Sequence, residues 1–276
     1  MNPLKQLSFW LDTFKLFFNR KGSDAVIILS FTTLLSIVPV LAVVISVFAK
    51  TNIFENLSNR VLNQLFEYIV PSSITNAQDY LLQFSQQASQ LKGVGILFVL
   101  ITTMMLLRTV DQRINLFWDN QHTRRWWLSL AHYLGVALFG PLLLAASIAL
   151  SSYLSALPLV NLFKNIEVIN GFSFLAIVPF FLNWLGFSFL YRYVPLAKVH
   201  WQSAFIGGLL AAICLELLKL GFSLYLKWFP TYDLIYGVFA AIPIFLLWIY
   251  LNWFVVLFNA AIVSQLERYR TEQLVE

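Results

Sequence analysis

Long apolar stretches separated by shorter polar segments dominate the chain. A helix that crosses a membrane needs roughly 20 consecutive apolar residues, because the hydrocarbon core of a bilayer is about 30 Å thick. Six stretches meet or nearly meet this length. They cover approximately residues 25–49, 93–107, 128–154, 171–191, 203–227 and 237–264. The pattern predicts an all-α polytopic membrane protein with six transmembrane helices, in which residues 1–276 form a single integral membrane domain.

The composition agrees with this reading and adds an orientation. Of the 276 residues, 59% are hydrophobic and 11% are charged, whereas a soluble globular protein carries about 25% charged residues. Twelve of the 18 Lys and Arg residues fall in the N-terminal segment, the loops 108–127 and 192–202, and the C-terminal tail, against five in the alternate segments. Because cytoplasmic loops are enriched in Lys and Arg, both termini are expected to be cytoplasmic.

Two regions outside the apolar stretches have the spacing of amphipathic helices. In residues 1–24, apolar side chains recur at intervals of three and four. They are Leu7, Trp10, Leu11, Phe14, Phe17 and Phe18. With Lys5, Lys15 and Arg20 beside it, this stripe is typical of a helix that lies in the cytoplasmic interface, and packing against other helices is an equally good alternative. In residues 50–92, two further stripes predict a helical cap on the outer side.

Polar residues inside the predicted spans are the first candidates for function. Glu216 and Lys219 lie three residues apart near the middle of span 203–227, so they can pair on one helix face. A charge near the bilayer centre costs about 2.5–3.5 kcal/mol on insertion scales, so it persists where it is paired, hydrated or required. One reading is a polar cavity in which Glu216 handles a proton, a cation or a polar headgroup. The alternatives are a pair that only locks helices, or a span over 199–219 that lets Lys219 reach the interface.

Further polar or helix-breaking residues in the spans could share such a cavity. They are Ser36, Pro39, Asn183, Asn252 and Asn259. Asparagine in a membrane helix more often bonds to a neighbouring helix than to a ligand. Proline frees a backbone carbonyl that either lines a cavity or only kinks the helix.

Arginines that follow the second predicted span form another candidate group. They are Arg108, Arg113, Arg124 and Arg125. These side chains can contact lipid headgroups. A simpler role is that of positive-inside markers, or of interfacial anchors where Arg124 and Arg125 precede two tryptophans.

Catalytic and metal-binding patterns are not found in the sequence. His122, His132 and His200 are scattered, without H-x-H or H-x-x-x-H spacing, and the one cysteine, Cys214, excludes an intramolecular disulfide. A metal-dependent nuclease needs clustered His, Asp and Glu. We therefore expect no catalytic residues, no bound metal or cofactor and no nucleic-acid partner. Membrane lipids are the expected partners, and a homo-oligomer is left open.

Several phrases resemble the YihY/BrkB family. LLSIVPVLAV in the first span is similar to its S-x-x-P-x-L signature, and RINLFWD (113–119) resembles its L-N-x-[IF]-W stretch. LYRYVPLAKVHWQSAFIGGLLAAICLELLKLGFSLYL is similar to its fourth loop and fifth span, and YGVFAAIPIFLLWIYLNWFVVLFNAAI to its last span. The resemblance covers most of residues 25–264. It implies a six-span protein of the bacterial inner membrane, and the family carries an old label as a tRNA-processing ribonuclease (ribonuclease BN) and looser ones as virulence factors or transporters.

The residues favour a transporter or lipid-handling permease with a polar cavity around Glu216. The alternative is a non-transporting membrane scaffold in envelope assembly or virulence. The ribonuclease label has no support in the residue pattern, so the chain is not expected to be an enzyme. No ATP-binding motif is present, so transport would be passive, gradient-driven or dependent on a partner. The substrate, the coupling ion, the direction, the protonation state of Glu216 and an inverted repeat of spans 1–3 and 4–6 stay open.

Overall fold

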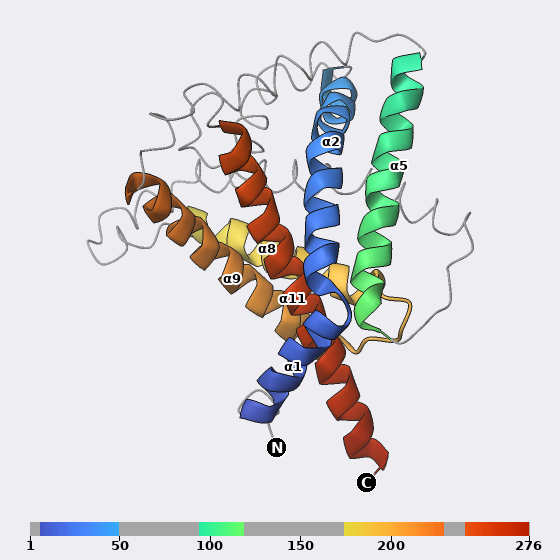
Figure 1. Ribbon diagram of the computed structural model, residues 1–276, viewed down its shortest axis with the longest axis vertical. Coiled ribbons are helices and arrows are strands. Elements are labelled where there is room, and N and C mark those ends of the chain that lie inside the picture. The colour runs from blue at the N-terminus through green and yellow to red at the C-terminus, as the bar shows by residue number, and fades with distance from the viewer. Residues whose placement is uncertain (1–5, 50–93, 119–173, 229–240, 276) are drawn as a thin grey trace.

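The structure, a computed structural model, describes residues 6–49, 94–118, 174–228 and 241–275 (Figure 1). Its elements are α1 (Leu7–Asn19), α2 (Gly22–Ala49), α5 (Val94–Ile114), the short 3-10 helix η3 (Asn115–Phe117), α8 (Phe174–Tyr193), α9 (Trp201–Trp228) and α11 (Ala241–Val275). The predicted all-α class is confirmed in these ranges. The predicted cap at 50–92 and the predicted span at 128–154, together with Arg124 and Arg125, lie outside the described residues.

The other predicted spans coincide with helices. Within the described ranges, α9 and the part Pro243–Glu272 of α11 are long and apolar enough to cross a membrane, and Gly22–Ile37 of α2 is a shorter apolar helix. The count of six spans stays a prediction. Helix α11 continues to Val275, beyond the predicted span 237–264, because no glycine or proline interrupts the chain after Pro243.

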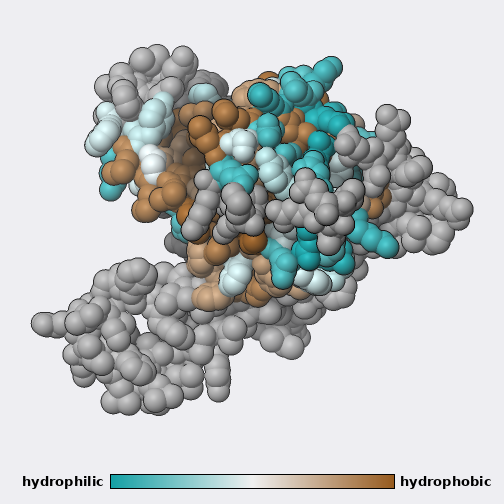
Figure 2. All heavy atoms as spheres, turned by 90° about the horizontal axis from the view of Figure 1, so that it is seen from below, coloured by the Kyte–Doolittle hydropathy of each residue, from teal (hydrophilic) through white to brown (hydrophobic). Residues whose placement is uncertain are grey.

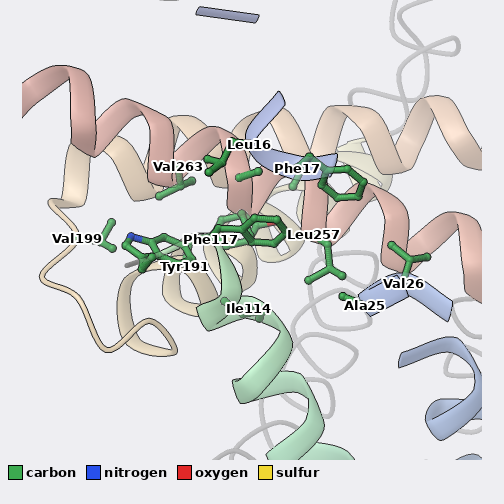
Figure 3. Close-up of a cluster of buried hydrophobic side chains, with 14 of the residues drawn as sticks. Leu16, Phe17, Ala25, Val26, Ile114, Phe117, Tyr191, Val199, Leu257 and Val263 are labelled. Carbon is green, nitrogen blue, oxygen red and sulfur yellow. The ribbon is translucent and has the colours of Figure 1, made fainter. Parts of the chain in front are cut away.

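Helix α11 is the element around which the described helices gather. It packs against α9 and α2 and is also contacted by α1, while α8 pairs with α9 and α5 pairs with α2. Figure 3 shows the cluster of buried side chains where these helices meet. In it, the ring of Phe17 (α1) stacks on Phe117 (η3) with centroids 5.8 Å apart, and Tyr191 (α8) donates a hydrogen bond to the carbonyl of Val256 (α11) at 2.9 Å.

Helix α1 presents apolar side chains on two faces. Phe9, Leu16 and Phe17 are buried, Phe9 against the α11 residues Ile262 and Leu266 and the other two in the cluster of Figure 3. The exposed apolar residues are Leu7, Leu11, Phe14 and Phe18. The interfacial and packing readings of this helix are therefore compatible, since one face packs while the other remains open. Phe17 belongs to the packed face, whereas Leu11, Phe14 and Phe18 of the same predicted stripe are exposed.

A tight turn fixes the direction of α1 relative to α2. The N–H of Lys21 donates to the carbonyl of Phe18 at 3.0 Å, and Lys21 adopts the left-handed conformation with φ 54°. A Cβ atom added to Gly22 would lie 2.6 Å from the ring of Phe17. Glycine is therefore required at this position, because only its bare backbone lets the ring pack against the turn.

Small residues let α9 approach two helices at once. They are Ser203, Ala204, Gly207, Gly208, Ala211 and Ala212, and all are buried. A Cβ at Gly208 would lie 2.8 Å from the backbone nitrogen of Ser188 and 2.9 Å from the carbonyl oxygen of Trp184, both in α8. A Cβ at Gly207 would collide with the side chain of Val263 in α11. Such stripes are how membrane helices reach close backbone contact.

Candidate functional site

Glu216 and Lys219 form an ion pair in α9. The Nζ atom of Lys219 donates to Oε1 of Glu216 at 2.8 Å, so the contact predicted from their spacing is present. The side chain of Glu216 is 39% exposed and that of Lys219 is 32% exposed. The pair is thus neither sealed in the protein core nor free at the surface, and a further group can reach it.

The pair occupies a boundary on the surface of α9. The exposed stripe of the helix consists of Ile213, Leu217, Leu220 and Leu224. The packed face in the same part of the helix consists of Ala211, Ala212, Leu215 and Phe222. Glu216 and Lys219 lie between these two faces, and both are half-buried. Apolar side chains that are exposed on a helix long enough to cross a membrane are expected to face lipid, which would place the ion pair at the border of a lipid-facing surface.

The predicted cavity residues are not joined to Glu216 by any hydrogen bond within the described ranges. The side chains of Asn252 and Asn259 donate to their own helix, to the carbonyls of Trp248 and Val255 at 2.7 and 2.8 Å. The Oδ1 atom of Asn259 is buried without a hydrogen-bond partner among the described residues. Ser36 is buried in α2, Asn183 is half-buried in α8, and Pro39 lies within α2. Their role in a cavity stays a prediction.

The two described arginines of the second candidate group differ in environment. Arg108 is exposed on α5. Arg113, in the last turn of α5, is half-buried, and its Nε atom is inaccessible and has no hydrogen-bond partner within the described part of the chain. Arg108 is therefore more accessible to a lipid headgroup than Arg113, and the contact itself stays a prediction for both.

A polar junction that the sequence did not predict joins the end of α5 to the segment between α8 and α9. The side-chain amide of Asn115 donates to the carbonyl of Val194 at 3.3 Å and to the carbonyl of Asp111 at 2.8 Å. Its Oδ1 atom accepts the N–H of Leu196 at 2.8 Å. Asn115 lies within the motif RINLFWD, which could have been the signal for this role, but a motif does not reveal its partner.

The C-terminal half of α11 closes the same junction. Ser264 donates to the carbonyl of Phe117 at 2.6 Å, and Glu267 accepts two hydrogen bonds from His200. These contacts border an open recess of about 390 Å³. It is lined by Trp118, Ala197, Lys198, Ser264, Glu267, Arg268, Thr271 and Glu272. Hydrophilic side chains gather on this end of the described part, where α1 begins and α11 ends (Figures 1 and 2).

This recess and the Glu216–Lys219 pair are separate places on the protein. Glu216 follows Trp201, the first residue of α9, by 15 residues, which is roughly 22 Å of helix. A cavity around Glu216 therefore stays a prediction. In the described part of the chain, no group of three or more His, Cys, Asp or Glu side chains is placed to hold a metal ion.

Comparisons with known proteins place the chain in a family. The family described as virulence factor BrkB matches residues 13–276. A UPF0761 membrane protein of Chromohalobacter salexigens is 38% identical over 246 residues, which is 88% of this chain and 60% of the relative. Those of Azotobacter vinelandii and Kangiella koreensis are 35% and 32% identical over 96% and 95% of this chain, and over 64% and 66% of their own lengths.

The chain thus spans about three-fifths to two-thirds of the length of these curated relatives. No solved structure matches it. The apolar helices, the motifs in their observed places and the match over nearly the whole chain agree with one another. The protein belongs to the YihY/BrkB family of membrane proteins.

Proposed function

We propose that this membrane protein moves an amphiphilic solute between the two sides of the membrane, with a phospholipid as the favoured class. The observation that supports this proposal is the half-exposed Glu216–Lys219 ion pair at the edge of the lipid-facing stripe of α9. The headgroup of the phospholipid would pass along the ion pair, while its acyl tails remain against the apolar stripe of α9. We propose no catalytic activity for the chain.

The position of the pair along α9 gives the physical reason. Tryptophans stand at both ends of the helix, at Trp201 and Trp228, and tryptophan is enriched at membrane interfaces. Glu216 lies near the middle between them. An ion pair in contact with hydrocarbon loses its hydration, which costs free energy. This desolvation cost falls when water or a polar headgroup contacts the pair. An ion pair beside a lipid-facing surface would therefore lower the free-energy barrier for a headgroup that crosses the bilayer.

The experiment is leaflet exchange of fluorescently labelled phospholipid in proteoliposomes. The variants are Glu216→Gln, which keeps the shape and removes the charge, and the double reversal Glu216→Lys with Lys219→Glu, which keeps the pair. The matched control is Glu272→Gln, because Glu272 is an exposed carboxylate near the end of α11. All variants are compared at equal amounts of folded protein.

We expect exchange by the wild type and by the control, and a loss of at least about tenfold in Glu216→Gln. If the pair only stabilises packing, the double reversal should restore exchange in full. If the carboxylate is needed at position 216, exchange should stay low in the double reversal. Absence of exchange in the wild type would overturn the proposal. It would favour the non-transporting scaffold as the function to test next.

A further inference from the structure

An exposed aromatic surface forms where α8 ends and α9 begins. The rings of Phe189 and Tyr193 stack with centroids 5.8 Å apart, and those of Trp201 and Phe205 stack at 5.3 Å. An edge contact of 5.9 Å between Tyr193 and Trp201 joins the two stacks. Phe189, Tyr193 and Trp201 are 49%, 47% and 39% exposed. A cluster of aromatic side chains of this size does not normally remain exposed to water, so lipid or another molecule is expected to cover it.

Arg192 lies against this surface. Its guanidinium carbon is 5.6 Å from the ring centroid of Tyr193 and 5.7 Å from that of Trp201, which is within the range of a cation–π contact. Its Nε atom is buried without a hydrogen-bond partner, and no carboxylate among the described residues forms an ion pair with it. The residue as a whole is only half-buried. The rings therefore hold a guanidinium group whose charge is not neutralised by a described acidic side chain.

We propose that Arg192, Tyr193 and Trp201 form a binding site for the phosphate of a phospholipid. A guanidinium group presents donors in a flat fork that matches phosphate oxygens. Tyrosine and tryptophan sit at headgroup level in membrane proteins. The site lies on the side that the Lys and Arg distribution predicts to be cytoplasmic, where anionic lipids attract cationic side chains.

The surroundings favour a lipid over a free phosphate ion as the source of that phosphate. The aromatic surface continues along α8 as an exposed stripe of Phe181, Leu185 and Phe189, at intervals of four residues. These side chains offer an acyl tail a continuous apolar track that ends at Arg192. A soluble phosphate would make no use of this track. The inference does not depend on transport through Glu216, because binding at Arg192 can be measured on its own.

The experiment is native mass spectrometry of the purified full chain in detergent. The protein is titrated with phosphatidylglycerol, with diacylglycerol of the same acyl chains, and with phosphatidylglycerol in the presence of inorganic phosphate. The variants are Arg192→Gln, Arg192→Lys and the matched control Lys227→Gln. Lys227 is an exposed cation at the opposite end of α9, so it reports the effect of losing one positive charge elsewhere.

We expect the wild type and Lys227→Gln to prefer phosphatidylglycerol over diacylglycerol. Arg192→Gln should weaken phosphatidylglycerol binding about tenfold, as loss of a hydrogen bond to a charged group does. Arg192→Lys should keep part of the preference, because an ammonium group is a point charge without the fork. Unchanged diacylglycerol binding by each variant shows that the apolar track is still folded.

Two results would overturn the proposal. One is a wild type that binds the two lipids equally, or an Arg192→Gln variant that behaves like the Lys227→Gln control. The other is displacement of phosphatidylglycerol by an equal concentration of inorganic phosphate, which would show that the acyl track contributes nothing and that the site takes a soluble phosphate.

Discussion

Glu267 in α11 holds the residue that precedes α9. One of its carboxylate oxygens accepts the backbone N–H of His200 at 3.0 Å, and the other lies 2.8 Å from the ring Nδ1 of the same residue. The first N–H groups of a helix have no partners within that helix, and a negative charge is favourable beside them. A carboxylate from α11 thus caps α9 and attaches the two helices to each other at one end.

Replacement of Glu267 should therefore destabilise the fold. Because Glu267→Ala removes both hydrogen bonds to His200, we expect the free energy of unfolding to fall by about 1–3 kcal/mol. Glu267→Gln should cost less, since an amide oxygen can still accept the backbone N–H. Thermal unfolding in detergent measures the difference. Glu272→Ala, on the exposed side of the same helix, should change the midpoint little, and an equal effect of both variants would contradict this role.

Asn115 should be needed both as a donor and as an acceptor. Asn115→Ala loses the hydrogen bonds to Val194 and Leu196, so we expect a loss of about 1–3 kcal/mol in the free energy of unfolding. Asn115→Asp should be at least as harmful, because its carboxylate would face Asp111 Oδ1, now 3.0 Å from the amide. The exposed neighbour Gln112 provides the control as Gln112→Ala. A tolerated Asn115→Asp variant would show that the donor is not needed.

Two glycines of α9 should respond oppositely to the same substitution. Gly208→Ala places a methyl group against the backbone of α8, which cannot yield without moving the helix, so we expect a loss of about 1–3 kcal/mol. Gly221→Ala meets nothing within 4 Å and should stabilise the helix by up to about 1 kcal/mol. Unfolding midpoints of the two variants give the comparison. Equal midpoints would mean that α8 and α9 are not in the close contact described.

Two lysines should respond oppositely to glycine. Lys21 has a positive φ, so Lys21→Gly relieves backbone strain and should leave the stability unchanged or raise it by up to about 1 kcal/mol. Lys15 lies exposed inside α1, where Lys15→Gly should cost about 1 kcal/mol. Both variants remove one exposed positive charge, so a difference between their unfolding midpoints reports the backbone conformation. A destabilised Lys21→Gly variant would mean that its side chain matters more than its conformation.

The helices of the described part were largely predictable, since they follow from apolar length. Residues 203–227 were expected and Trp201–Trp228 is observed for α9, and the Glu216–Lys219 contact followed from spacing on one helix. Helix α11 continues beyond residue 264, where the predicted span ends, because nothing in the sequence stops the helix there. Spacing did not separate Phe17, which is buried, from the exposed residues of the same stripe, since both faces of α1 are apolar.

The polar junction and the Arg192 site were not predictable in the same way. The partners are far apart in the chain and meet only because of the tertiary fold, as in the pairs Asn115–Val194 and Glu267–His200. Hydrophobic periodicity identifies the face that a residue occupies but not its partner. The consecutive glycines 207 and 208 were a usable signal, because adjacent small residues in an apolar helix indicate close helix contact.

The central place of α11 has a consequence for biosynthesis. Asp12 accepts a hydrogen bond from Tyr269, and Thr33 accepts one from Trp253, so α1 and α2 complete their contacts only with a helix made more than 200 residues later. The ribosome delivers α1 and α2 long before their partner exists. During that interval, the side chains that later face α11 must be covered by lipid or by the insertion machinery. The contacts between these helices can therefore form only after α11 has been synthesised and has inserted beside α1 and α2.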